Sequence, residues 1–123
     1  MGSCIGPLHP GLACLAEPVD GLYCLFLVRA ECFNWHPGMM LDSATLQPPF
    51  MAELVTLADP TSRFSFLNYA KQVGPLYAFY IKEDFFLMRR EYNQYSQWMV
   101  EQLDSLRFEH LLQHVHYLDE RHL

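Results

Sequence analysis

The clearest pattern near the start of the chain is a continuous apolar and aromatic run from Leu22 to Val28. Such a run predicts a strand buried on both faces of a parallel sheet, because a strand with one solvated face would alternate. A short helix-like segment at Gly11–Ala16 precedes this run, and residues 17–21 form a predicted turn between the two. A helix followed by a buried strand favours an α/β fold built from βαβ units.

The next segment, Phe33–Pro60, is rich in Pro, Gly, Met and Asp and shows little periodicity. A connection of this length predicts a loop that lines a ligand. Helical spacing returns at Phe64–Gln72, which Gly74 can end, and Pro75 can start a further short helix through Ile81.

A third helix is predicted at Arg89–Leu103, because Tyr92, Tyr95, Met99 and Leu103 fall on one stripe. The tail alternates only weakly at Leu106–His110 and Val115–Leu118. Those two segments predict two strands, or one strand and a loop.

Composition and charge narrow the class of protein. A length of 123 residues with 51% hydrophobic and 15% aromatic residues is typical of one globular domain that can fill a core. The net charge of −6 and the scattered Lys and Arg argue against a nucleic-acid partner. The longest apolar stretch is far shorter than the ~20 residues that span a bilayer. With no recognisable export signal, we expect a cytoplasmic protein.

Four cysteines are spread along the first third of the chain without a Cys-x-x-Cys pair: Cys4, Cys14, Cys24 and Cys32. In a chain with no export signal, this spacing indicates reduced and mostly buried thiols.

One candidate binding motif is the turn from Cys4 to His9, where Gly6 could bring backbone N–H groups close to a pyrophosphate at a helix N-terminus. An ordinary proline-containing turn explains the same residues, since Gly6 alone of the three motif positions is glycine. The acidic ribose ligand expected about 20 residues later is also missing, because Val28 and Arg29 end the predicted strand.

Three ordered blocks carry a more specific signal: Phe33-Asn-Trp-His-Pro-Gly-Met-Met40, Ala44–Thr56 and Asp59–Tyr69. Together with Arg89-Arg-Glu-Tyr-Asn-Gln-Tyr-Ser-Gln-Trp98, they closely resemble the N-terminal part of the siderophore-pathway lysine, ornithine and diamine N-monooxygenases. The resemblance covers the chain from Gly6 to about Leu118.

The resemblance implies an α/β fold with two Rossmann-type domains, one for FAD and one for NADPH, which together transfer one oxygen atom to a neutral amine. Residues 1–123 would form the N-terminal part of the three-layer FAD-binding domain, with a parallel sheet and a helical insertion. The NADPH-binding domain would be absent, so the chain alone would be inactive. A full-length protein could be a homo-oligomer.

By matching position, the resemblance places Gly6, Trp35, His36 and Gln47 along the cofactor, with Arg89 near the flavin. It assigns no catalytic side chain, because the cofactor carries the chemistry. The sequence departs from the family at Cys4, His9 and Val28, all on the dinucleotide side.

A further departure concerns the substrate. Lysine and ornithine hydroxylases carry a Lys that holds the substrate carboxylate, whereas this chain has Ala52 at that position. Relatives with this Met-Ala-acid pattern act on diamines such as putrescine or cadaverine. Ala52 therefore favours a diamine substrate.

Three other interpretations compete with this one. His110, His114 and His116 with Glu109 could bind a metal, although solvated histidines are the commoner case. The aromatic residues of the region 64–80 could stack on bases, although core packing is the commoner use. Finally, the chain could be a truncated relic or interaction module that binds no cofactor.

Overall fold

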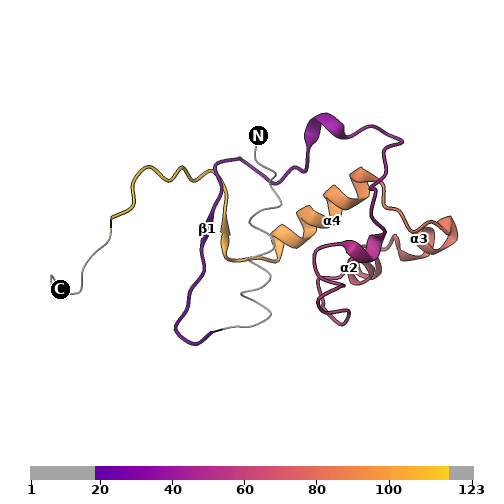
Figure 1. Cartoon of the computed structure of the whole chain (residues 1–123), viewed down its shortest axis with the longest axis horizontal. Helices are drawn as coiled ribbons and strands as arrows, with labels where there is room; N and C mark the ends of the chain where they lie inside the picture. Colours follow the sequence, from indigo (N-terminus) through magenta and orange to yellow (C-terminus); the bar gives the residue numbers. More distant parts are fainter. Residues whose placement is uncertain (1–18, 117–123) are drawn as a thin grey trace.

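The computed structural model describes residues 19–116, which contain one parallel two-stranded sheet and three α-helices (Figure 1). Strand β1 spans Phe26–Leu27 and strand β2 spans Leu106–Arg107, with Phe26 opposite Leu106. The segment between them holds the 3-10 turns η1 (Pro37–Met39) and η2 (Phe50–Ala52) and all three helices. A long crossover of this kind is what a parallel pair requires.

The predicted strand Leu22–Val28 is shorter and more exposed than expected. Only Phe26–Leu27 is strand, Tyr23 is 96% exposed, and Leu22 and Leu25 are also exposed. A parallel strand is buried on both faces only when neighbouring strands and helices cover it. Within residues 19–116, β1 has β2 as its one neighbouring strand, so the prediction of burial on both faces was wrong there.

Helix α2 spans Phe66–Val73, close to the predicted segment. The hydroxyl of Ser65 accepts a hydrogen bond from the backbone N–H of Asn68 at 3.3 Å, which caps the first turn. Gly74 ends the helix at a φ of 104°, a left-handed conformation that glycine adopts without strain. The prediction for this helix and its terminator is confirmed.

Helix α3 spans Leu76–Lys82 directly after Pro75, as predicted, but none of its residues is buried. Tyr77 and Tyr80 are each 74% exposed, whereas Phe66 of α2 is 3% exposed. The expectation that the whole aromatic region 64–80 packs inside was therefore wrong for Tyr77 and Tyr80, whereas Phe79 packs partly buried against the core. Sequence periodicity predicts where a helix forms, but it does not show which faces of that helix other elements cover.

Helix α4 spans Arg89–Glu101 and lies between the sheet and the α2–α3 pair (Figure 1). The Glu91 carboxylate accepts from the backbone N–H of Met88 at 2.9 Å and so caps the helix start. The predicted apolar stripe is confirmed, since each of its members is buried: Tyr92, Tyr95, Met99 and Leu103.

The described part of the tail agrees with the second predicted alternative, one strand and a loop. Leu106–Arg107 forms β2, whereas residues 111–116 contain no regular structure. Of the cysteines, Cys32 is exposed and Cys24 half-buried, so the expectation of buried thiols fails for these two. The predicted helix at Gly11–Ala16 and the residues Cys4, Gly6, His9 and Cys14 lie outside the described residues.

A buried carboxylate joins the elements of the core. Glu53 is 8% exposed, and its two oxygens accept hydrogen bonds from five donors. The donors are the backbone N–H groups of Val55 (2.7 Å), Thr56 (3.2 Å) and Phe66 (3.3 Å), the Thr56 hydroxyl, and the Tyr95 hydroxyl (2.9 Å). Through these bonds one side chain connects its own loop, the start of α2 and the middle of α4.

Tyr95 completes this arrangement from α4. Its hydroxyl also lies 2.8 Å from the backbone carbonyl of Phe64, so its proton is shared between two acceptors. Its ring packs at 5.7 Å from Phe66 and 5.6 Å from Tyr69, measured between ring centroids. Burial, followed by the charge of Glu53, raises the pKa of the Tyr95 hydroxyl far above its ordinary value.

Replacing Tyr95 by Phe should destabilise the chain, because the ring remains while the buried Glu53 loses one donor. We expect the free energy of unfolding to fall by about 1–3 kcal/mol. The matched control is Tyr77→Phe, which removes the same hydroxyl from a side chain that is 74% exposed. It should change the stability by less than ~0.5 kcal/mol. Equal unfolding curves for the two variants in urea would contradict the role given to Tyr95.

Candidate functional site

A hollow forms where the long loop meets the first turn of α4. The loop runs antiparallel to the residues before the helix, with a bridge between Thr45 and Met88. Backbone hydrogen bonds extend this contact, from Leu46 N–H to the Leu87 carbonyl at 2.8 Å and from Arg89 N–H to the Ala44 carbonyl at 2.9 Å. A loop with no regular structure of its own is thereby held in one position beside α4.

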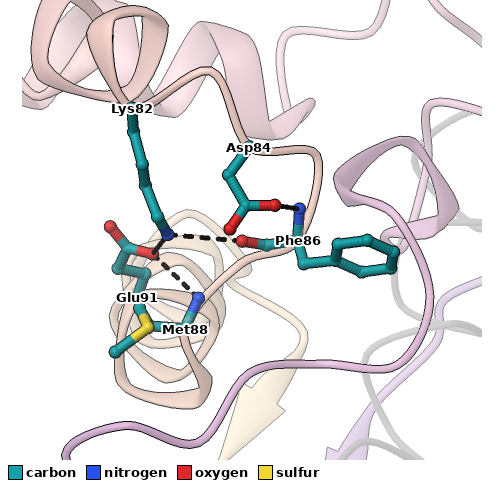
Figure 2. A network of polar contacts seen from close by, with 5 residues as sticks. All are labelled: Lys82, Asp84, Phe86, Met88 and Glu91. Atoms are coloured by element: carbon teal, nitrogen blue, oxygen red, sulfur yellow. Dashed lines mark hydrogen bonds and ion pairs between the residues drawn. The ribbon is translucent and has the colours of Figure 1, made fainter.

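The connection from α3 to α4 is held by a small polar network (Figure 2). The Lys82 ammonium donates to the Phe86 carbonyl at 3.3 Å and lies 3.7 Å from the Glu91 carboxylate. Asp84 accepts from the Phe86 N–H at 3.0 Å. Together with the Glu91 cap on Met88, these bonds fix where α4 begins and hence where Arg89 projects.

The hollow is a pocket of about 380 Å³, within the range of small-molecule sites. Five of the residues selected from the sequence line it: Trp35, His36, Gln47, Ala52 and Arg89. The sixth, Gly6, lies outside the described residues. The remaining lining residues are Met39, Leu46, Pro48, Pro49, Phe50, Glu53, Leu87 and Tyr92.

Trp35 is held in the pocket through contacts of both its backbone and its ring. Its backbone N–H donates to the Asn93 side-chain oxygen at 2.7 Å, which ties the loop to α4. Its ring meets Tyr92 edge-on at 4.9 Å, and the Arg89 guanidinium lies 5.5 Å from its centroid. The indole Nε1–H is buried and has no hydrogen-bond acceptor among residues 19–116, which is uncommon for a buried donor.

His36 follows Trp35 in an uncommon backbone conformation. Its φ of 44° lies in the left-handed region, which costs energy for a residue other than glycine. This bend starts η1, where the His36 carbonyl accepts from the Met39 N–H at 2.9 Å. It also sets the imidazole edge-on to the Trp35 ring at 5.3 Å. The turn therefore presents two rings to the same pocket.

The charged groups of the pocket sit on different segments. Arg89 lies beside Trp35, and its guanidinium also approaches the Met39 sulfur at 3.8 Å. Glu53 belongs to the other segment, directly after Ala52 at the end of η2. Burial, and then the charge of Glu53, raises the pKa of the Tyr92 hydroxyl to about 12.

Sequence reasoning missed three residues of this site. Tyr92 was assigned to core packing alone, although it also lines the pocket. Asn93 lies among other polar residues of α4, and nothing in the sequence pattern indicated that its side chain accepts a hydrogen bond from the Trp35 backbone. Glu53 was noted only as the acid of the Met-Ala-acid pattern, and its position inside an apolar segment was the sign of its buried role.

The pocket suits a flat, amphipathic aromatic ring. Trp35, His36 and Tyr92 provide apolar and aromatic walls, while the orphaned indole N–H and the Gln47 amide can bond to ring carbonyls or nitrogens. The Arg89 guanidinium can balance negative charge. A flavin has these properties, so the described residues fit the ring system that the resemblance implies. The residues expected to face the pyrophosphate lie outside the described part.

The described residues contain neither a metal site nor a membrane-spanning helix. Among residues 19–116, no three His, Cys, Asp or Glu side chains are grouped so that they could hold a metal ion. The rings of His114 and His116 lie 6.3 Å apart, and both residues are exposed. In the same range, no helix is long and apolar enough to cross a bilayer.

The fold matches solved structures of other proteins. The cadaverine monooxygenase of desferrioxamine biosynthesis from Erwinia amylovora, solved bound to FAD, is 65% identical with a TM-score of 0.75, over 85% of this chain and 24% of that one. The ornithine N-hydroxylase of Kutzneria sp. 744, solved with reduced FAD, NADP⁺ and L-ornithine, is 33% identical with a TM-score of 0.78, over 84% and 25%.

Curated relatives agree with these structures. Putrescine N-hydroxylase of Shewanella oneidensis is 59% identical over 88% of this chain, and that of Acinetobacter baumannii is 43% identical over all of it. The aligned regions make up 22% and 28% of those two proteins, so the chain spans about a quarter of their length. The sequence profile of the L-lysine 6-monooxygenase/L-ornithine 5-monooxygenase family matches residues 1–123. The chain therefore belongs to the lysine/ornithine N-monooxygenase family, with putrescine and cadaverine N-hydroxylases among its nearest relatives.

Proposed function

We propose that this chain forms the flavin-side wall of an FAD- and NADPH-dependent diamine N-monooxygenase of siderophore biosynthesis. It would be the N-terminal part of a three-layer, Rossmann-type FAD-binding domain. The observation that carries the proposal is the pocket itself, which gathers Trp35, His36, Gln47 and Arg89 from separate segments around one hollow. Relatives that are 65% and 33% identical were solved with FAD, which supports the same cofactor here.

In this proposal FAD, once reduced, supplies the activated oxygen, and the protein residues hold and shield it. The Trp35 indole N–H and the Gln47 amide would hold polar atoms of the flavin ring, and Arg89 would balance its negative charge. The aromatic and proline lining excludes water. A dry pocket also lowers the pKa of the reacting amine, which favours its neutral, nucleophilic form.

The NADPH site is proposed to lie in the part of the full-length relatives that this chain does not cover. After residue 11 the sequence contains no further glycine-rich turn of the dinucleotide-binding type. Turnover by this chain would therefore depend on the remaining three quarters of the enzyme.

A diamine is the proposed substrate because Ala52 lines the pocket without a charge that could hold a carboxylate. The names of the relatives also favour a diamine substrate. Two are putrescine N-hydroxylases and one is a cadaverine monooxygenase, whereas the ornithine N-hydroxylase has only 33% identity.

Adding FAD to the purified chain should quench tryptophan fluorescence and shift the visible flavin spectrum, because Trp35 lies in the pocket. Trp35→Phe keeps an aromatic ring but removes the unpartnered donor, so FAD affinity should fall about tenfold. The matched control is Trp98→Phe, since Trp98 packs on Tyr69 and does not line the pocket. If the wild-type chain leaves the flavin spectrum unchanged, the chain is a relic or interaction module and the proposal fails.

The substrate preference can be tested in a chimera in which residues 19–116 replace their counterparts in the Shewanella oneidensis enzyme. Ala52→Lys places a cation in the pocket and should raise the kcat/KM ratio of ornithine over putrescine at least tenfold. Met51→Lys is the matched control, because Met51 is 48% exposed and does not line the pocket. An unchanged ratio in Ala52→Lys would show that position 52 does not select the substrate.

A further inference from the structure

Glu53 places a negative charge at the pocket, and no Lys or Arg of residues 19–116 forms an ion pair with it. It lines the pocket next to Ala52 and is 8% exposed. Within residues 19–116 the ion pairs are Lys82–Glu91 and Arg90–Asp42, and neither includes Glu53. The five donors around its oxygens suit an ionised carboxylate, which only accepts.

The surroundings of Glu53 let this charge act over a distance. Glu53 is 8% exposed, and a charge so withdrawn from solvent is screened less than it would be in water. The pocket-lining Tyr92 already experiences it, because the charge of Glu53 contributes to the raised pKa of its hydroxyl. The opposite charge of the pocket, Arg89, stands on another segment, against Trp35. The negative charge of Glu53 therefore lies directly next to Ala52 in the pocket lining.

A direct salt bridge from a ligand to Glu53 is not expected. A carboxylate offers about four lone-pair positions, and the protein's own five donors already occupy them. Glu53 would therefore select a ligand through the electrostatic field of its carboxylate, and the fold would keep that carboxylate in place. An uncharged group at the Ala52 end would gain nothing from that field, and an anionic group would be repelled by it.

We propose that the fixed charge of Glu53 makes the Ala52 end of the pocket select the distal ammonium group of an aliphatic diamine. This inference rests on the proposed function, since it assigns one end of the same pocket. The inference adds Glu53 as a specificity-determining residue. Its carboxylate provides the negative charge, and Ala52 beside it carries no positive charge that would neutralise it. If Glu53 served only to stabilise the core, replacing it would change the affinity for every ligand by the same factor.

The test compares putrescine with pentylamine, in which a methyl group replaces one ammonium, using the chimera described above. Dissociation constants from calorimetry should favour putrescine about tenfold. Glu53→Gln removes the charge and should bring the ratio close to one. The matched control is Glu101→Gln, which removes an equal charge from an exposed position at the end of α4 and should leave the ratio unchanged.

Because Glu53→Gln can weaken folding, Ala52→Lys provides a second arm. It places a cation beside Glu53 while all five donors remain, and it should also remove the preference for putrescine over pentylamine. A preference that survives in Ala52→Lys, or a wild-type ratio near one, would overturn the inference. If the wild-type chimera discriminates between the two amines but oxidises neither with FAD and NADPH, the proposed function fails and the inference stands.

Discussion

The structure depends on one buried carboxylate. Placing Glu53 in the core is costly unless its oxygens are fully hydrogen-bonded, and the chain meets this requirement from three segments. Val55 and Thr56 donate hydrogen bonds to Glu53 within the local turn. Phe66 donates from the start of α2, and Tyr95 donates from the middle of α4. Satisfying that single group therefore determines how the helices meet and where the loop before Glu53 must run.

The candidate site follows from this arrangement. Once α4 is anchored, its first turn presents Arg89 and Tyr92, and its second turn presents Asn93 to the backbone of Trp35. The loop is held from both sides, so its rings keep a fixed geometry although it contains little regular structure. Catalysis by a bound cofactor needs such preorganised walls more than it needs reactive side chains. The same carboxylate that organises the core also places a negative charge in the pocket lining.

Local signals predicted the helices well, because caps, a terminating Gly74 and an apolar stripe act within one segment. The strand Leu22–Val28 was predicted poorly, since its length and burial depend on partners distant in sequence. Five pocket residues were found only because rare motifs matched a family; pattern alone would have assigned Trp35 to packing. The role of Glu53 was not predictable, because two of its donors lie 13 and 42 residues away.

The central claim is that the pocket between the long loop and α4 holds the flavin ring. A crystal structure of the chimera carrying residues 19–116, grown with FAD, tests it most directly. We expect density for the ring system in this pocket, with a polar ring atom within hydrogen-bond distance of the Trp35 indole nitrogen and Gln47 and Arg89 beside it. Flavin density elsewhere, with the indole nitrogen still lacking an acceptor, would contradict the account.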